Sequence, residues 1–299
     1  RRFCATKHHI LNFAALKGTE GLACEKQEAW KVMPFLKKLL SLGYMQRDME
    51  NMEAGLRPPP ERDSVPGGKT EDGRQVIWKP DNKCERSILC FLRKNGFIAC
   101  PEFLFLDDDG RACYALPKGK APPSTAVFTE KQFRAFMKLL RRMHDAGAGE
   151  SDGLVVCHHD LLPANVLFDP PYGHLGSLPC AIVHWDVGCY GRRWEDIVYA
   201  CWLWLDIGNP TRDSEETLSR IAAGLDAYAG DNPALRREIC TDFAGRLCVR
   251  METVAFRWET QGDPTPDIRR WVNSSQHWVF EHRDALNALE QPGTPLDIG

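Results

Sequence analysis

Apolar residues recur along this chain with two spacings, one typical of β-strands and the other of α-helices. Short runs rich in apolar and β-branched residues predict strands over residues 74–79, 102–106, 111–116, 154–156, 166–168 and 180–186. Apolar positions three and four residues apart predict helices over most of 1–55 and over 82–95, 129–147, 194–207, 214–229, 233–261 and 266–291. Residues 65–119 therefore resemble a small sheet with one helix.

Proline, glycine and capping signals divide this pattern into segments. Residues 56–66 contain three consecutive prolines and predict a stiff linker. Residues 107–110 read Asp-Asp-Asp-Gly, a hairpin-turn signal, whereas the Leu-Pro-Lys-Gly of residues 116–119 breaks the strand pattern and predicts a hinge. We expect an N-terminal helical extension and linker over 1–64, a sheet lobe over 65–119 and a helical lobe over 120–299.

The composition is that of an ordinary globular protein. The chain has 299 residues, of which 43% are hydrophobic, enough for one large domain or two lobes around a cleft. No apolar run reaches the length of a membrane helix, and the N-terminus has no secretory-signal layout. A net charge of −3 gives no reason to expect nucleic acid as a partner. We expect no membrane partner and a cytoplasmic location.

The cysteines favour the same compartment. The chain has 12 of them, and no two form a C-x-x-C pair. Most lie inside apolar runs, where a free cysteine behaves as a small hydrophobic residue. A reducing compartment is thus favoured over a disulfide framework or a zinc site.

The strongest chemical signal lies between two of the predicted strands, in residues 155–169. His158, His159, Asp160 and Asn165 form a polar loop there, and Pro163 prevents one continuous strand. Rigid strands thus present an Asp and an Asn five positions apart on one short turn. This arrangement suits a proton acceptor and a neutral oxygen ligand that meet at one reacting centre.

A second signal lies at Lys79, which ends a predicted strand. Glu85 follows on a helix and shares a face with apolar residues at spacings of three, four and seven. An acid on an apolar face is costly unless it is paired, and Lys79 is the candidate partner. The alternative is that Glu85 lies at the edge of the apolar face, in water.

A glycine pair, Gly67-Gly68, precedes this strand. It would allow a backbone loop to approach phosphates closely, but Gly-Gly and the nearby Asp-Gly are also hairpin-turn signals, and the turn is favoured. Lys69-Thr70 does not complete a Walker loop.

Taken in order, these motifs resemble the aminoglycoside phosphotransferase and choline kinase group, over roughly residues 65–205. The group's H-G-D-x-x-x-x-N loop corresponds to His158-His159-Asp160-Leu-Leu-Pro-Ala-Asn165. Its I-D-W-[ED] segment and the residues after it correspond to Val183-His184-Trp185-Asp186, Gly191, Asp196, Ile197 and Ala200. Its E-x-x-x-L-x-x-L-x-x-x-G-x-x-x-P pattern corresponds to Glu85, Leu89, Leu92, Gly96 and Pro101.

The resemblance implies an α+β, protein-kinase-like, two-lobed fold with a small antiparallel-sheet N-lobe and a mostly helical C-lobe. It also implies ATP and magnesium as cofactors. Asp160 would accept the proton of the attacking hydroxyl or orient it, and Asn165 would bind magnesium. Lys79, held by Glu85, would bind the nucleotide phosphates, and backbone groups of the hinge at Leu116–Gly119, including Leu116 and Lys118, would contact adenine. His158 and Asp196 would brace the loop.

Two residues depart from the group's pattern. His184 stands where the group has its metal-binding Asp, and an imidazole is a poor magnesium ligand. In a strand Asp186 would point to the same side as His184 and could bind the metal instead. The other departure is His159, in place of the glycine before Asp160.

Three explanations of these departures stay open. Asp186 replaces the usual ligand and the protein is an active kinase. Alternatively, the protein binds nucleotide as a pseudokinase. In the third case the fold carries a non-kinase reaction in which His184 or His159 is the acid–base group.

The sequence as a whole favours an ATP-dependent phosphotransferase that acts on a hydroxyl of a small molecule, with nucleotide and that small molecule as its partners. The acceptor and the oligomeric state are not readable. Arg250, Glu252, Arg257 and Trp258 are candidates to line the acceptor site, although a solvated amphipathic helix explains them equally well.

Overall fold

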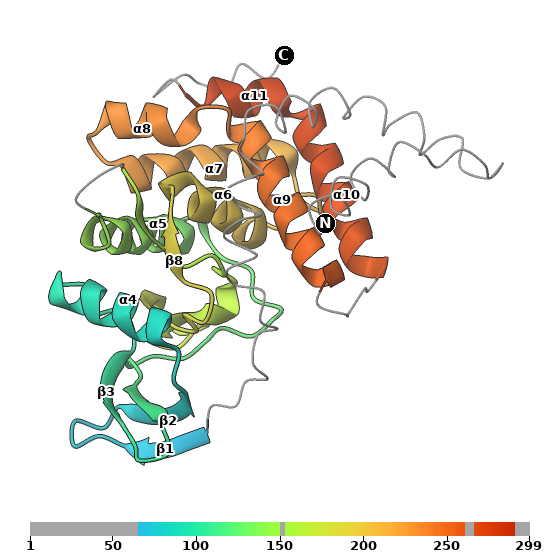
Figure 1. Ribbon diagram of the computed structural model, residues 1–299. Helices are drawn as coiled ribbons and strands as arrows, with labels where there is room; N and C mark the ends of the chain where they lie inside the picture. Colours follow the sequence, from blue (N-terminus) through green and yellow to red (C-terminus); the bar gives the residue numbers. More distant parts are fainter. Residues whose placement is uncertain (1–64, 150–152, 261–265, 291–299) are drawn as a thin grey trace. The chain divides into compact units, whose positions relative to one another are not determined.

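A four-stranded antiparallel sheet forms the N-terminal part of the structure (Figure 1). In this computed structural model, which describes residues 65–149, 153–260 and 266–290, the strand order is β1-β2-β4-β3. The strands are β1 (Val65–Lys69), β2 (Gln75–Pro80), β3 (Glu102–Leu106) and β4 (Arg111–Ala115). The strands predicted over 74–79, 102–106 and 111–116 are confirmed, and the predictions for residues 1–64 lie outside the described residues.

Helix α4 (Lys83–Lys94) follows β2 and packs beside β3 (Figure 1). Its cap is Asn82, whose side chain accepts hydrogen bonds from the backbone N–H groups of Cys84 and Glu85. Gly96 follows the helix with φ +87°, a left-handed conformation that glycine adopts at little cost. The helix predicted over 82–95 is confirmed, and Glu85 is buried on its apolar face.

The expectation that Gly67-Gly68 forms the hairpin turn is wrong. Both glycines lie in β1. The hairpin turn is formed around the other predicted turn signal, Asp72-Gly73, which is confirmed: the N–H of Gly73 donates to the carbonyl of Thr70 (2.9 Å). A Cβ on Gly67 would lie 2.3 Å from Nε1 of Trp78, so the glycine makes room for the indole ring. Steric contact with Trp78, rather than turn geometry, is the physical reason for Gly67.

Two short two-stranded sheets carry the polar loop. β5 (Val155–Cys157) pairs with β8 (Cys189–Gly191), and β6 (Val166–Asp169) pairs with β7 (Leu178–Ile182). The two strands on either side of the loop are present as predicted, and a 3-10 turn, η1 (Pro163–Asn165), lies between them. Each strand pairs with a strand later in the sequence, so the loop projects from two separate ladders.

The strand predicted over 180–186 ends earlier than expected. β7 stops at Ile182, although the N–H of Val183 still donates to the carbonyl of Asn165 (2.9 Å), the residue opposite it in the register of β6 and β7. His184 then has φ +64°, which ends the extended conformation. The expectation that His184 and Asp186 share one side of a strand is therefore wrong.

Helices make up most of the rest of the described chain. They are α5 (Glu130–Ala146), α6 (Arg193–Trp204), α7 (Ser214–Ala229), α8 (Pro233–Cys240), α9 (Phe243–Thr260), α10 (Pro266–Glu281) and α11 (Arg283–Ala288). The capping box of Thr129 and Gln132 opens α5 as predicted. The helix predicted over 233–261 is two helices, since Asp242 has φ +50° between α8 and α9. The helix predicted over 266–291 is likewise divided, near His282.

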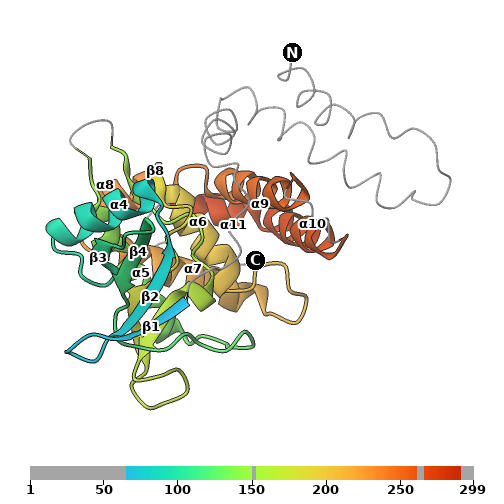
Figure 2. The ribbon, with the colours of Figure 1, turned by 60° about the horizontal axis from the view of Figure 1, so that its bottom comes forward.

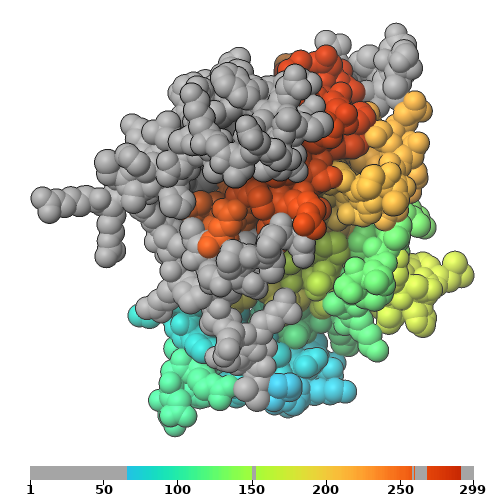
Figure 3. Space-filling model, turned by 90° about the vertical axis from the view of Figure 1, so that its right-hand side faces the viewer, coloured from blue at the N-terminus to red at the C-terminus, as the bar shows by residue number. Residues whose placement is uncertain are grey.

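Helix α6 lies in the core of this helical part. Ten of its residues are buried, and Trp204 at its end stacks on Phe136 of α5 at 4.1 Å between ring centroids. Helices α9 and α10 lie side by side (Figure 2), and α9 also packs against α6. On the face drawn in Figure 3 the sheet (blue to cyan) and these C-terminal helices (orange to red) lie at opposite ends. No helix in the described ranges has the length and apolar character needed to cross a membrane.

Candidate active site

A buried carboxylate supports the polar loop. Asp196 on α6 is 0% exposed, and it accepts hydrogen bonds from the backbone N–H groups of His158 (2.7 Å) and His159 (2.8 Å). Nε2 of His144 lies 3.2 Å from the same carboxylate. Burial alone would raise the pKa of Asp196, but these donors and nearby histidines hold it well below its ordinary value. The loop is therefore built around a fixed anion.

His144, Cys157 and Asp196 also place potential metal-ligand atoms within 4.8 Å of one another. Hydrogen bonding accounts for the closeness of these three side chains without a metal ion, because both carboxylate oxygens of Asp196 already have hydrogen-bond partners. The Nδ1 atom of His144 is paired with the hydroxyl of Tyr228 (2.7 Å). The contacts are those of a structural core.

His158 lies beneath the loop. It is 0% exposed, its Nδ1 accepts the N–H of Asp160 (3.2 Å), and its Nε2 lies 3.0 Å from the carbonyl of Val183. This pairing requires the neutral tautomer with the proton on Nε2. These contacts brace the backbone on both sides of the site.

His159 occupies the position where the resemblance predicts a glycine. Its φ is +59°, a left-handed conformation in which glycine is most at ease. The side chain is buried, its Nε2 has no hydrogen-bond partner among the described residues, and burial lowers its pKa to about 3. An imidazole with this pKa stays neutral near pH 7, so the geometry gives no support to His159 as an acid–base group.

Asp160 and Asn165 meet as the sequence predicts. The side-chain amide of Asn165 donates to the carbonyl of Asp160 (2.7 Å) and to its carboxylate (3.0 Å). The hydroxyl of Tyr199 on α6 donates to the other carboxylate oxygen (3.3 Å). Asn165 is 1% exposed, and its Oδ1 has no hydrogen-bond partner in the described part of the chain. A buried amide oxygen without a donor is costly, which makes it a candidate ligand for a cation.

Lys79 joins the two acids expected near it. Its Nζ lies 2.5 Å from Oε1 of Glu85 and 2.9 Å from Oδ1 of Asp186. Glu85 is 2% exposed, and burial, with a contribution from the negative charge of Asp186, raises its pKa to about 7. Burial would lower the pKa of Lys79, but the two carboxylates outweigh it and leave that pKa raised. One cation is shared between two acids.

Residues 183–186 connect Lys79 with the polar loop. Val183 bonds to Asn165 through its N–H and to His158 through its carbonyl. At the other end the side-chain amide of Asn82 reaches the carbonyl of Asp186 (3.4 Å). His184 lies between them and is exposed. The segment thus brings the motifs of the sheet and of the loop together at one place.

The hinge contributes an apolar surface that the sequence did not single out. Leu167, Ala181 and Val183 form a buried cluster, and Leu116 packs against it. The N–H of Leu116 donates to the carbonyl of Gln75 (2.8 Å), so it is not available for the predicted backbone contact with adenine. Two members of this cluster could have been found from their place in the sequence. Leu167 follows Asn165 by two residues, and Val183 directly precedes His184, so both lie next to predicted site residues.

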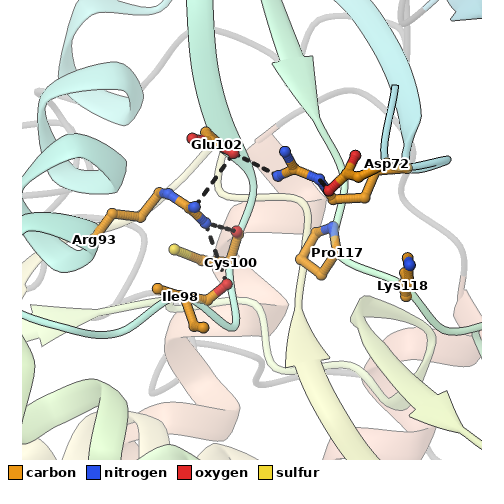
Figure 4. Close-up of a pocket in the computed structure, with 8 residues that line it drawn as sticks. Asp72, Arg93, Ile98, Cys100, Glu102, Pro117 and Lys118 are labelled. Carbon is orange, nitrogen blue, oxygen red and sulfur yellow. Dashed lines mark hydrogen bonds and ion pairs between the residues drawn. The ribbon is translucent and has the colours of Figure 1, made fainter. Parts of the chain in front are cut away.

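A pocket of about 330 Å³ lies at the hinge (Figure 4). Its lining includes Lys118, and four of its charged side chains are already joined, since Glu102 contacts both Arg74 and Arg93, and Arg74 also contacts Asp72. Arg93 also donates to the carbonyls of Ile98 (3.2 Å) and Cys100 (3.1 Å). These contacts tie the end of α4 to the start of β3, and the lining contains none of the predicted catalytic residues.

Of the residues expected to line the acceptor site, Arg250 on α9 contacts the polar loop. Nη2 of Arg250 donates to the carbonyl of His159 (2.5 Å), and its guanidinium lies 4.5 Å from the ring centroid of Tyr199. Burial lowers the pKa of Arg257, and the negative charge of Asp160 opposes that shift. Glu252 instead bonds to Arg269 and Gln276 on α10, and the side chain of Trp258 lies outside the described residues.

Comparison with known proteins adds a distant relative and a fold. No family model matches the sequence. Among curated proteins, the trifolitoxin immunity protein of Rhizobium leguminosarum bv. trifolii is 22% identical over 267 residues, with 74% of this chain and 95% of that protein covered.

Solved structures of small-molecule kinases resemble the chain more closely in shape than in sequence. An ethanolamine kinase from Plasmodium vivax superposes with a TM-score of 0.52 at 13% identity, covering 75% of this chain and 82% of its own. For a choline kinase from Streptococcus pneumoniae the TM-score is 0.46 at 15% identity, with 77% and 91% covered. The small antiparallel sheet followed by helices, together with the likeness to the ethanolamine kinase, shows that this chain has a protein-kinase-like fold similar to that of the ethanolamine kinase.

Proposed function

We propose that this protein is an ATP-dependent phosphotransferase that acts on a hydroxyl group of a small molecule. The observation that carries the proposal is the junction made by residues 183–186. This segment links the loop of Asp160 and Asn165 to the ion pair of Lys79 and Glu85. Phosphoryl transfer depends mainly on positioning and charge neutralisation, which such a junction supplies.

Asp160 is the group that receives the proton. The oxygen of the acceptor hydroxyl forms a bond to the γ-phosphorus of ATP while its proton passes to the carboxylate of Asp160. The bond from that phosphorus to the bridging oxygen breaks, and ADP leaves with the electron pair. Asn165 and Tyr199 fix the carboxylate by hydrogen bonds, so it is already oriented for this role. Lys79, held by Glu85, balances the charge of the nucleotide phosphates.

Asn165 and Asp186 are the residues that would hold magnesium. The Oδ1 of Asn165, which has no hydrogen-bond partner among the described residues, and the carboxylate of Asp186 are hard oxygen donors of the type that this ion prefers. When bound, the ion would neutralise negative charge on the phosphates. Leu116, partly buried against the cluster of Leu167, Ala181 and Val183, would offer an apolar contact to the adenine ring.

The substitution Asp160→Asn tests this proposal. We expect turnover of ATP to fall at least about 100-fold, the usual contribution of a positioned general base, while Mg-ATP still raises the melting temperature. Asp169→Asn, at the end of β6, is the matched control and should keep normal turnover. A chain that shows no shift in melting temperature with ATP, with or without magnesium, does not have the proposed function.

A second candidate, a nucleotide-binding pseudokinase, is favoured by one observation. His184 is exposed at the position where the resemblance predicts the metal-binding carboxylate. His184→Asp separates the two candidates, because aspartate also tolerates the left-handed backbone at this position. Magnesium-dependent ATP turnover above that of the parent chain would support a kinase that His184 weakens. If the native activity is instead lost, the histidine has a role of its own.

A further inference from the structure

Side chains hold the backbone of the polar loop at three successive carbonyls, those of residues 159–161. Nη2 of Arg250 donates to the first (2.5 Å), the amide of Asn165 to the second (2.7 Å) and Nε1 of Trp204 to the third (3.1 Å). Asn165 belongs to the loop, and Trp204 lies at the end of α6. Of these three donors Arg250 is the one that comes from α9, so it links the loop to a helix far along the chain.

The burial of Arg250 is costly. This residue is 7% exposed, and its Nε is buried and has no hydrogen-bond partner in the described ranges. Burying a charged group whose donors are not all used costs free energy. Besides its bond to His159, the guanidinium lies 4.5 Å from the ring centroid of Tyr199, an attractive contact between a cation and an aromatic face. Both contacts adjoin Asp160, because His159 precedes it in the chain and Tyr199 bonds to it.

Tyr199 connects Arg250 with the carboxylate of Asp160. Its hydroxyl donates to Oδ1 of that carboxylate (3.3 Å), while the amide of Asn165 donates to Oδ2 (3.0 Å). Burial, with the negative charge of Asp160, raises the pKa of Tyr199, so near pH 7 the phenol keeps its proton and acts as the donor. The bond from Tyr199 is long for a hydroxyl donor, so a small movement of the ring breaks it. Arg250 packs on this ring.

We propose that Arg250 is a positioning residue for phosphoryl transfer: it holds the carbonyl of His159 and the ring of Tyr199, and thereby fixes the direction of the Asp160 carboxylate. This inference rests on the proposed function, since it concerns the base of the same reaction. A general base must lie within hydrogen-bond reach of the hydroxyl that it serves, and a displacement of about 1 Å can cost about 100-fold in rate. For this role Arg250 itself needs no contact with the nucleotide or the acceptor.

The first test compares kcat with KM for Mg-ATP, with water as the acceptor. Arg250→Met keeps a long apolar side chain but loses the donors and the charge. We expect kcat to fall about 10- to 100-fold with KM for ATP unchanged, because Lys79 and Glu85 are untouched. Arg250→Lys, which keeps the charge, should restore part of kcat. An unchanged kcat in Arg250→Met, or in Arg250→Lys if the methionine variant does not fold, would overturn the inference.

Arg246, about one turn earlier on α9, supplies the matched control. It makes the same kinds of contact away from the loop, since its Nη1 donates to the carbonyl of Glu238 (2.8 Å) and its guanidinium lies 5.2 Å from the ring centroid of Trp194. Arg246→Met should therefore lower the melting temperature but leave kcat unchanged. An equal fall of kcat in Arg246→Met and Arg250→Met would show that a general loss of packing explains the effect, and the inference would fail.

Crystal structures keep the two proposals apart, because they require no turnover. In Arg250→Met we expect the hydroxyl of Tyr199 to lie beyond hydrogen-bond distance of Asp160, whereas the parent chain and Arg246→Met keep this bond. If both side chains take the same positions in all three structures, only the inference on Arg250 fails, whatever the kinetics. If instead the parent chain turns over no ATP and Mg-ATP does not raise its melting temperature, the proposed function fails, and the structures still decide whether Arg250 positions Asp160.

Discussion

Two buried acids support the two halves of this site, and their pKa values are shifted in opposite directions. Asp196, beneath the polar loop, receives hydrogen bonds from two backbone N–H groups and lies against His144, and its pKa is lowered. Glu85, beneath the sheet, shares the cation Lys79 with Asp186 and keeps one oxygen without a partner among the described residues, and its pKa is raised. The comparison teaches that burial alone does not set the charge of an acid, because the supply of donors decides it.

The functional meaning of the difference lies in rigidity. The carboxylate of Asp196 takes its hydrogen bonds from the loop backbone and lies against His144 of α5, so these contacts anchor the loop of Asp160 to the core. The group around Lys79 is instead a balance of charges, and any added phosphate changes that balance. We infer that the loop is the rigid half of the site and the Lys79 group is the responsive half.

The largest effect is expected from Asp196→Asn. The substitution removes the buried anion while its N–H donors remain, and we expect a loss of about 3–5 kcal/mol in the free energy of unfolding. Urea unfolding measures it. Asp108→Asn, at the exposed turn between β3 and β4, is the control and should change stability by less than about 0.5 kcal/mol. If both variants unfold at the same urea concentration, Asp196 does not support the loop.

A smaller effect, which depends on pH, is expected at Glu85. Its pKa is raised from 4.5 to about 7, so between these values the folded chain holds a proton that the unfolded chain releases. Stability contributed at this site therefore falls as pH rises through that window. Relative to Glu85→Gln, the parent chain should lose about 2 kcal/mol across it.

Urea unfolding of both chains at several pH values measures this difference. Glu102→Gln, an acid of β3 that is part-buried beside Arg74, serves as the control and should leave the pH dependence of the parent chain in place. Parallel curves for the parent chain and Glu85→Gln would show that Glu85 titrates normally.

The smallest effect is expected at His159. Burial lowers its pKa from 6.5 to about 3, so the unfolded chain takes up a proton in this window that the folded chain refuses. The stability from this site is complete above the higher value and is lost as pH falls below it. Between pH 7.5 and pH 5.5 the parent chain should lose about 1 kcal/mol more of its free energy of unfolding than His159→Gly does.

Melting temperatures at these two pH values check the prediction for His159. His174→Gly, in a turn away from the site, is the control and should keep the acid sensitivity of the parent chain. An unchanged difference between the two pH values in His159→Gly would show that this histidine is protonated in the folded chain.

Local patterns predicted much of this architecture. The spacing of apolar residues located α4 and α5, and turn signals located the hairpin between β3 and β4, because these elements are determined by neighbouring residues. The pairing of Glu85 with Lys79 also followed from local reasoning, since an acid on an apolar face needs a partner.

Other features depended on residues far apart in the sequence. Gly67 was read as a turn residue because nothing near it shows that Trp78 packs on it from the next strand. The early end of β7 depends on a left-handed His184, and the break after α8 depends on a left-handed Asp242. The contacts of Arg250 with the carbonyl of His159 and with the ring of Tyr199 likewise require α9 to pack against α6.

The two histidines that depart from the family pattern share a backbone property with a consequence for evolution. His159 and His184 both have left-handed φ angles, of +59° and +64°. Glycine, asparagine, aspartate and histidine are the residues that enter this region most readily. An exchange between aspartate and histidine at position 184 therefore requires no rearrangement of the chain. Natural selection can replace the chemical group at this point of the fold by single substitutions while the scaffold persists.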